Sequence, residues 1–217
     1  MSQLFVVGTP IGNLQDFSPR AVETLRSVDF IAAEDTRVTL KLLNHFEVKK
    51  PMVSYYEHNL REKGELILSR ILAGETCAVV SDAGMPCISD PGEDLVRLCA
   101  SHGVPVTVIP GPSAAVSALS VSGLVTSRFT FEGFLSTNKA SRAKHLASLQ
   151  SERRTMIFYE APHKLPYTLA IWREPSERIA RFLSAASLRK FMKRFFVLPS
   201  AGRVHILHRP CQKGSLS

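Results

Sequence analysis

A regular alternation of short apolar runs with amphipathic segments limits the folds open to this chain more than any other feature. Seven runs have the length and composition of strands: residues 4–7, 30–33, 52–55, 77–80, 106–109, 129–131 and 155–159. Helical patterns lie between most of them. Such alternation predicts an α/β fold with largely parallel strand pairing in the first half. Ligands of such sheets bind where strands end and helices begin, so the loops after the strands should carry the function.

Local signals predict where helices begin. Ser18-Pro19 supplies an N-cap and an N1 proline for a helix that continues through apolar residues at helical spacing. Asp90-Pro91-Gly92-Glu93 is interpreted in the same way, as a cap, an N1 proline and a capping-box acid. Residues 139–150 have the pattern of a polar helix.

The charge distribution sets the last part of the chain apart. The chain has a net charge of +8 and a pI of about 9.6, which would suggest an acidic partner such as RNA. Residues 171–217 hold 10 Lys+Arg and 2 Asp+Glu, whereas residues 1–170 hold 17 of each. The whole excess therefore lies in the tail. A domain boundary is expected at Gly123–Arg128, between an N-terminal α/β domain (1–122) and the start of a second one (123–170).

Targeting signals and metal sites are not expected. The chain begins almost directly with a strand-like run, and no apolar run has the length of a membrane span, so the expected location is the cytosol. The four cysteines, Cys77, Cys87, Cys99 and Cys211, form no CxxC pair and no His/Cys metal spacing. Neither a disulfide framework nor a zinc site is predicted.

Two of the loops after strands are rich in Gly, Pro, Asp and Ser. Gly8–Asn13 could bring its backbone close to a ligand or form a tight turn, but it is neither GxGxxG nor a phosphate-binding P-loop. Ser81–Gly92 is too long and too polar for a simple connection. Asp82 in that loop has no capping role, and it could bind ribose hydroxyls, a ligand ammonium group or the proton of a nucleophile.

Three further loops hold candidate residues, each with a structural alternative. Glu34–Arg37 could contact substrate, with Arg37 suited to phosphate, or could be a capped helix start with an internal salt bridge. Pro110–Ala115 leaves room for a flat ligand at a helix N-terminus, or allows close packing of helix on sheet. Phe158–Lys164 contains His163 beside Glu160, although a lone histidine is more often structural.

These loops, in this order, resemble those of the ribosomal RNA small subunit methyltransferase I family, within the tetrapyrrole-methylase superfamily. The resemblance extends without a break from residue 3 to about residue 170. Its most specific parts are EDTR at 34–37 and SDAGMPCISDPG at 81–92. The other matching stretches are Gly8–Asn13, Pro110–Ala115, Phe131–Phe134 and Phe158–Lys164.

The resemblance implies a class III S-adenosylmethionine (SAM) methyltransferase: two α/β domains with SAM folded between them, in a homodimer. The implied reaction is methyl transfer to the 2′-hydroxyl of a cytidine ribose in the decoding centre of 16S rRNA, within the small ribosomal subunit. By motif, the implied SAM pocket comprises Pro10, Asp82, Gly84, Ile88, Ser113 and Ala114. Glu34, Asp35 and Arg37 would face the RNA.

A hydroxyl that accepts a methyl group must also lose its proton, so a general base is expected. Asp82, Glu160 and His163 are the candidates. The alternatives to the rRNA enzyme are a small-molecule methylase that acts on a tetrapyrrole, an inactive remnant and a plain phosphate-binding module. The phosphate-binding module is the weakest of these, because no P-loop lysine is present.

The family motifs stop after Ala170, and a frameshift would explain why. The family continues with a segment like R-E-L-T-K-x-H-E-E, which is absent here. Read one frame on, residues 185–198 can encode Arg-Glu-Leu-Thr-Lys-Ile-His-Glu-Glu-Val-Phe-Arg-Thr, and residues 211–217 can encode Pro-Lys-Gly-Glu-Phe-Val. The alternative is that codon degeneracy allows such a match by chance. Against this, two separate segments fit the same shifted frame, and the excess of basic residues lies in the same part of the chain. Phe195–Leu198 would then lack designed partners, and an unstable or inactive product is predicted.

Sequencing the encoding DNA across codons 165 to 217 tests the frameshift directly. We expect the family segment to be readable in a shifted frame that opens near codon 171. The absence of an intact family frame at that position would reject the hypothesis.

Overall fold

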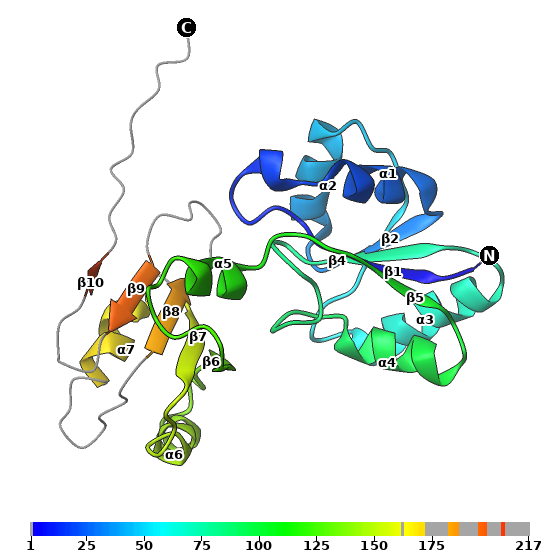
Figure 1. Ribbon diagram of the computed structural model, residues 1–217. Coiled ribbons are helices and arrows are strands. Elements are labelled where there is room, and N and C mark those ends of the chain that lie inside the picture. The colour runs from blue at the N-terminus through cyan, green and yellow to red at the C-terminus, as the bar shows by residue number, and fades with distance from the viewer. Residues whose placement is uncertain (1, 162, 172–181, 187–194, 199–204, 207–217) are drawn as a thin grey trace, which may run out of the picture. The chain divides into compact units, whose positions relative to one another are not determined.

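The computed structural model describes residues 2–161, 163–171, 182–186, 195–198 and 205–206 (Figure 1). They form two compact units, Met1–Ser113 and Ala114–Ser217. Among the described residues no helix has both the length and the apolar character needed to span a membrane.

The first unit is built on a five-stranded, fully parallel sheet with the strand order β3-β2-β4-β1-β5. The strands are β1 (Leu4–Val7), β2 (Phe30–Ala33), β3 (Met52–Ser54), β4 (Cys77–Val80) and β5 (Val106–Ile109). The uninterrupted apolar sequences of β2 (FIAA) and β4 (CAVV) are buried throughout, which suits strands that are covered on both faces. The predicted α/β class and parallel pairing are confirmed.

Helices cover the two faces of this sheet in pairs. The 3₁₀ turn η1 (Leu14–Asp16) precedes α1, and the helices are α1 (Pro19–Ser27), α2 (Thr36–His45), α3 (Leu60–Leu72) and α4 (Glu93–Ser101). Figure 1 shows α1 and α2 on one side of the sheet and α3 and α4 on the other. Each pair closes its own apolar core, one around Leu25 and Leu43, the other around Ile67 and Leu95. As predicted, Ser18 caps α1: its hydroxyl accepts from the Ala21 N–H at 3.1 Å.

The second unit contains a mixed sheet with the strand order β10-β9-β8-β7-β6. Its strands are β6 (Phe129–Phe134), β7 (Thr155–Glu160), β8 (Phe182–Ala186), β9 (Phe195–Leu198) and β10 (His205–Ile206). Its helices are α5 (Ala114–Ser120), α6 (Lys139–Ser148) and α7 (Leu165–Ile171). The polar helix expected over 139–150 is thus confirmed, and α5 belongs to this unit although it precedes the expected boundary.

One expectation about the tail is wrong. Phe195–Leu198 does have partners, because this strand pairs antiparallel with β8 and with β10. β8 in turn pairs in parallel with β7, so β7 is not left as an edge. Strand pairing uses backbone hydrogen bonds and β-favouring side chains, and the sequence FFVL provides both.

Replacing Gly8 by alanine should destabilise the first unit, because the added Cβ would lie 2.7 Å from the Cα of Gly111 and 2.6 Å from the sulfur of Met85. Overpacking of this kind costs about 2 to 3 kcal/mol. The control is Gly103→Ala, where the Cβ meets no atom within 4 Å and only the φ of +69° opposes it. Urea unfolding measures both variants. Equal losses would show that the contact at Gly8 is not tight.

Candidate functional site

The loops after β1 and β4 are bonded to each other where the connections leave the sheet toward opposite faces. The β1 connection leads to α1, and the β4 connection leads to α4 (Figure 1). Thr9 and Gly84 form an antiparallel bridge: the Thr9 N–H donates to the Gly84 carbonyl at 2.9 Å, and the Gly84 N–H donates to the Thr9 carbonyl at 3.2 Å. The buried Thr9 hydroxyl donates to the Ser81 carbonyl at 3.2 Å. Parallel sheets bind ligands at such a reversal of strand order, so we assign the candidate site here.

The loop after β5 reaches the same point through close backbone contacts. The Gly8 N–H donates to the Ile109 carbonyl at 3.1 Å. A Cβ built on Gly111 would lie 2.8 Å from the Cα of Gly8, so both positions require glycine. A Cβ on Gly84 would come within 3.4 Å of the Pro112 carbonyl. The ends of β1, β4 and β5 therefore converge, which is the arrangement that the glycine- and proline-rich loops predicted.

Asp82 is held by a reciprocal pair of hydrogen bonds to the loop after β2. Its Oδ1 accepts from the Asp35 N–H at 3.2 Å, and its own N–H donates to Oε2 of Glu34 at 3.2 Å. The Glu34 N–H also donates to the Val80 carbonyl at 3.3 Å. This clamp fixes the Asp82 carboxylate at the switch point and adds the β2 loop to the site.

Asp35 and Arg37 form the first turn of α2. Asp35 is the N-cap, and its Oδ1 accepts from the Arg37 N–H at 2.9 Å. The Arg37 guanidinium adds a two-point contact to the same carboxylate, with Nε to Oδ1 at 3.1 Å and the second nitrogen to Oδ2 at 2.9 Å. These hydrogen bonds lower the pKa of Asp35 to about 2. The guanidinium remains 87% exposed, so the helix-capping alternative is realised while one face of Arg37 stays open to a phosphate.

Asp90 is a site residue that the sequence analysis missed. It was interpreted as the N-cap of α4, which is wrong: the helix begins at Glu93, and Gly92 occupies the cap position with φ +134°. The pKa of Asp90 is raised to about 7, mainly by burial and then by the negative charges of Glu34 and Asp82, while a hydrogen bond with Ser81 opposes the rise. Glu34 reaches it from the end of another strand, so no local pattern could have identified this environment.

The loop that carries Asp82 and Asp90 adopts energetically unfavourable backbone conformations. Cys87 and Ser89 adopt φ values of +71° and +62°, a region that non-glycine residues rarely occupy. Gly92 is needed at its position, since a Cβ there would lie 2.6 Å from the Cys87 sulfur. Backbone conformations of this kind persist where the surrounding structure fixes them, and they gather at functional sites.

The residues predicted for the SAM pocket are brought to this region or to its border. Asp82 and Gly84 lie in the bonded loops, Pro10 is half-buried just beyond the bridge, and the Ile88 side chain is 52% exposed. Ser113 ends the first unit, and Ala114 begins both the second unit and α5.

The other predicted catalytic residues belong to the second unit. Glu160 is buried at the end of β7, where Oε2 accepts from the Thr168 hydroxyl at 2.6 Å and Oε1 accepts from the Ala161 N–H at 2.8 Å. This pattern is typical of a carboxylate that fixes the start of the following helix. His163 lies in the turn before α7 and is exposed.

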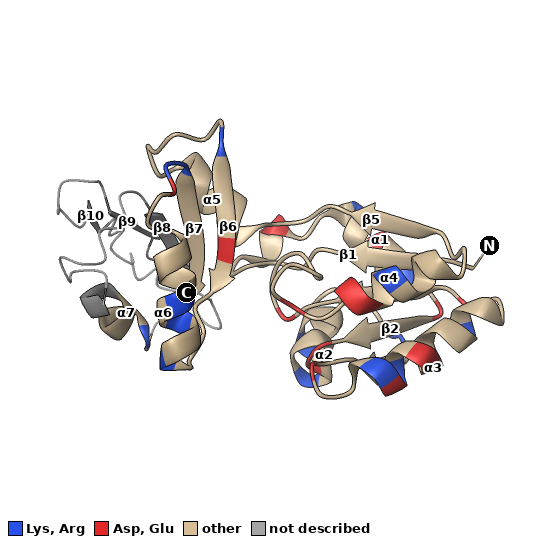
Figure 2. Cartoon of the chain, turned by 90° about the horizontal axis from the view of Figure 1, so that it is seen from below, with Lys and Arg blue, Asp and Glu red and all other residues tan. Residues whose placement is uncertain are grey.

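The two units carry opposite charge. Residues 1–113 contain 14 Asp+Glu and 10 Lys+Arg, whereas residues 114–170 contain 3 and 7. Figure 2 shows acidic residues in the loops and helices of the first unit, and basic residues on α6 of the second. Within the described ranges, no group of three His, Cys, Asp or Glu side chains could hold a metal ion. A cationic ligand suits the first unit, and an anionic partner suits the second.

Comparison with known proteins identifies similar sequences over most of the chain. The model of the tetrapyrrole (corrin/porphyrin) methylase family matches residues 3–198, which extends past the point where the sequence motifs end. A protein of Synechocystis sp. named ribosomal RNA small subunit methyltransferase I is 51% identical over 189 residues. That alignment covers 85% of this chain and 68% of the relative.

Two solved structures share the fold. Diphthine synthase matches with a TM-score of 0.56 and 13% identity, covering 94% of this chain and 80% of that protein. A uroporphyrin-III C-methyl transferase from Thermus thermophilus, solved in complex with S-adenyl homocysteine, matches with a TM-score of 0.50 and 18% identity, covering 84% and 68%. The fold class predicted from the sequence is confirmed.

Asp90→Asn should remove a pH-dependent loss of stability. The folded protein raises the pKa of Asp90 from the ordinary 3.8 to about 7, so it binds the proton more tightly than the unfolded chain does. The stability that this confers is complete below pH 3.8 and is lost as the pH rises through 7, with a slope of at most about 1.4 kcal/mol per pH unit. In urea unfolding from pH 4 to 8, the free energy of unfolding of the variant should increase relative to that of the wild type as pH rises. The exposed Asp16→Asn is the control, and parallel curves for wild type and Asp90→Asn would contradict the shift.

Proposed function

This chain belongs to the tetrapyrrole (corrin/porphyrin) methylase family, and from that premise we propose that it methylates the ribosomal RNA of the small subunit. The family and the name of the Synechocystis relative make the chain a SAM-dependent methyltransferase. The specific proposal is transfer to the 2′-hydroxyl of a cytidine ribose in the decoding centre of 16S rRNA. The chain spans 68% of the length of that relative.

The observation that carries this proposal is the convergence of three strand ends. Gly8 and Gly111 are in direct backbone contact, and a Cβ at either position would clash with the facing backbone. Glycine at strand ends leaves backbone that a flat ligand can approach closely. We propose that SAM binds beside these strand ends, with Pro10, Asp82, Gly84, Ile88, Ser113 and Ala114 as the residues that would hold it.

Electrostatics favour the same ligand. Glu34, Asp82 and Asp90 gather at the site closely enough for the first two to raise the pKa of the third. Crowded carboxylates are stabilised by a cation nearby. When bound, SAM supplies an electrophilic methyl group on a sulfonium, together with an ammonium group. The protein's task is then to orient the ligand, to align the attacking oxygen and to receive a proton.

Asp90 is the best placed of the possible bases. A general base works best with a pKa near the working pH, and the pKa of Asp90 is raised to about 7. Asp82 is committed to the clamp with Asp35, and Glu160 to Thr168 and Ala161. We therefore propose that Asp90 receives the proton, that Asp82 positions SAM, and that Glu160 has a structural role. His163 remains the second candidate.

The partner proposed for this chemistry is 16S rRNA or the small ribosomal subunit, bound by a homodimer in the cytoplasm. The exposed face of Arg37, beside the Asp82 clamp, can contact a phosphate. A tetrapyrrole methylase of the same fold is the alternative. The 51% identity to a protein named for rRNA favours the RNA substrate, because the likeness to the solved small-molecule methylase extends only to the fold. The proposed frameshift adds a third possibility, a remnant that folds only in part.

Methyl transfer from labelled SAM to small ribosomal subunits tests the function. We expect transfer by the wild type, which would contradict the inactive product predicted from a frameshift, and a loss of about 100-fold or more in Asp90→Asn, since general bases contribute at least that factor. Calorimetry should show unchanged SAM binding by Asp90→Asn and none by Asp82→Ala. Exposed Asp16→Asn is the control for both measurements.

Each failure has a distinct meaning. If the wild type binds SAM and methylates a tetrapyrrole but not RNA, the substrate is a tetrapyrrole and the rRNA proposal is wrong. If the wild type does not bind SAM, the chain is an inactive remnant. Full activity of Asp90→Asn would refute its role as the base, and alanine variants of Glu160 and His163 would then test the remaining candidates.

A further inference from the structure

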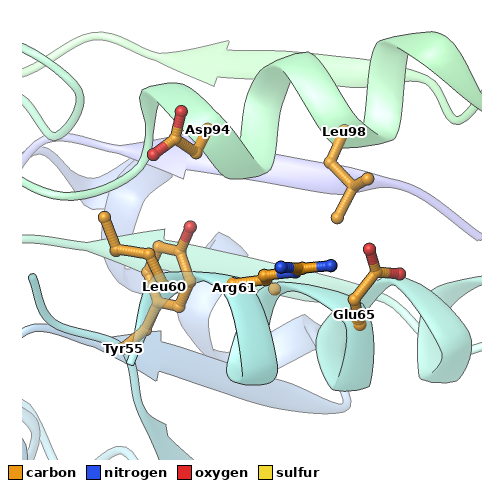
Figure 3. A pocket seen from close by; sticks show the side chains of 7 residues that line it. Tyr55, Leu60, Arg61, Glu65, Asp94 and Leu98 are labelled. Carbon is orange, nitrogen blue, oxygen red and sulfur yellow. The ribbon is translucent and has the colours of Figure 1, made fainter. Parts of the chain in front are cut away.

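A cavity in the first unit is lined by α3, α4 and Tyr55, the residue that directly follows β3. It occupies the cleft between α3 and α4 and encloses about 280 Å³. Figure 3 shows Arg61 and Glu65 on α3 facing Asp94 and Leu98 on α4 across this cleft. Its remaining lining residues are Tyr55, Leu60 and Gly64.

The floor of the cleft contains a polar group that lacks a partner. Tyr55 is 1% exposed, and its hydroxyl makes no hydrogen bond within the described structure. The Leu95 N–H lies near the Tyr55 oxygen and opposes the rise of its pKa, but the hydroxyl proton has no acceptor within the described structure. Burial, together with the carboxylate of Asp94, raises the pKa of Tyr55 to about 12, so the hydroxyl keeps its proton. Almost all buried polar groups are satisfied in folded proteins, so an unsatisfied hydroxyl at a cavity marks the position of a missing partner.

The sequence keeps the space above this hydroxyl open. Gly64 lies in the middle of the 13-residue helix α3, a position where glycine weakens a helix. A Cβ on Gly64 would lie 3.6 Å from Leu98 and 3.9 Å from the Tyr55 hydroxyl, which is ordinary contact. Alanine would therefore fit without strain and would fill part of the cleft. Helix packing alone does not require glycine here.

The chemistry of the walls restricts what can enter. Leu60 and Leu98 offer apolar surface on opposite sides, while Tyr55 requires a hydrogen-bonding atom at depth. The mouth has two carboxylates, Glu65 and Asp94, but only one guanidinium, which disfavours anions and favours groups with N–H or O–H donors. The guanidinium of Arg61 can stack on a flat ring.

We propose that the α3–α4 cleft binds an amino-substituted planar heterocycle of the nucleobase type, carried by a free nucleoside or by an unstacked RNA nucleotide. The ring lies between Leu60 and Leu98, a ring nitrogen or carbonyl accepts from the Tyr55 hydroxyl, and amino or ribose hydroxyl groups donate to Asp94 and Glu65. None of its lining residues is among those proposed to hold SAM, and its binding does not depend on methyl transfer.

Titration of the full-length protein with cytidine and adenosine, followed by calorimetry or NMR, tests the site. We expect weak but saturable binding, reduced by roughly fivefold or more in Tyr55→Phe, which loses one hydrogen bond. Because Phe removes an unsatisfied group, the same variant should have a higher Tm than the wild type in the absence of ligand. Tyr56→Phe is the matched control: its side chain is 42% exposed and lies outside the cleft, so both quantities should stay unchanged.

Gly64→Ala provides an independent check, because it should raise the Tm through better helix propensity while weakening nucleoside binding. Competition by a single-stranded oligoribonucleotide would assign the site to RNA, and its absence would assign it to free nucleosides. No binding of either nucleoside by the wild type overturns the proposal. Binding that is unaffected by Tyr55→Phe overturns it as well, and so does a lower Tm for that variant, since the hydroxyl would then have a partner.

Discussion

The bridge between Thr9 and Gly84 is the interaction on which the candidate site depends. It joins two loops that leave the sheet toward opposite faces, and the buried Thr9 hydroxyl replaces the water that the Ser81 carbonyl would otherwise need. With β4 fixed in this way, Asp82 meets the β2 loop and forms its paired hydrogen bonds with Glu34 and Asp35. The crowding of carboxylates around Asp90 follows from that placement.

Much of the first unit could be predicted from the sequence, because its signals are local. Runs such as CAVV indicate strands buried on both faces, and Ser18-Pro19 indicates a helix start, as the structure confirms. Asp90 was misinterpreted for the same reason. A local capping pattern cannot reveal that Gly92 takes the cap position, or that Asp90 faces Glu34 from a distant strand.

The second unit shows the same limit. Glu160 and His163 were predicted as candidate bases, which stays a prediction. The partners of Glu160, the Thr168 hydroxyl and the Ala161 N–H, could not be predicted, because only the folded turn brings them together. Phe195–Leu198 was expected to lack partners, yet any β-favouring segment can extend a sheet through its backbone.

The bridge also has a consequence for local motion. Loop amides usually open to solvent far more readily than those of strands, because few contacts hold them. The N–H groups of Thr9 and Gly84 lie in loops, yet each is bonded to the other residue's carbonyl beside a buried side chain. Their exchange with solvent deuterium requires opening of the bridge between the two loops. The part of the site nearest a ligand is therefore among the slowest to open, and its shape exists before anything binds.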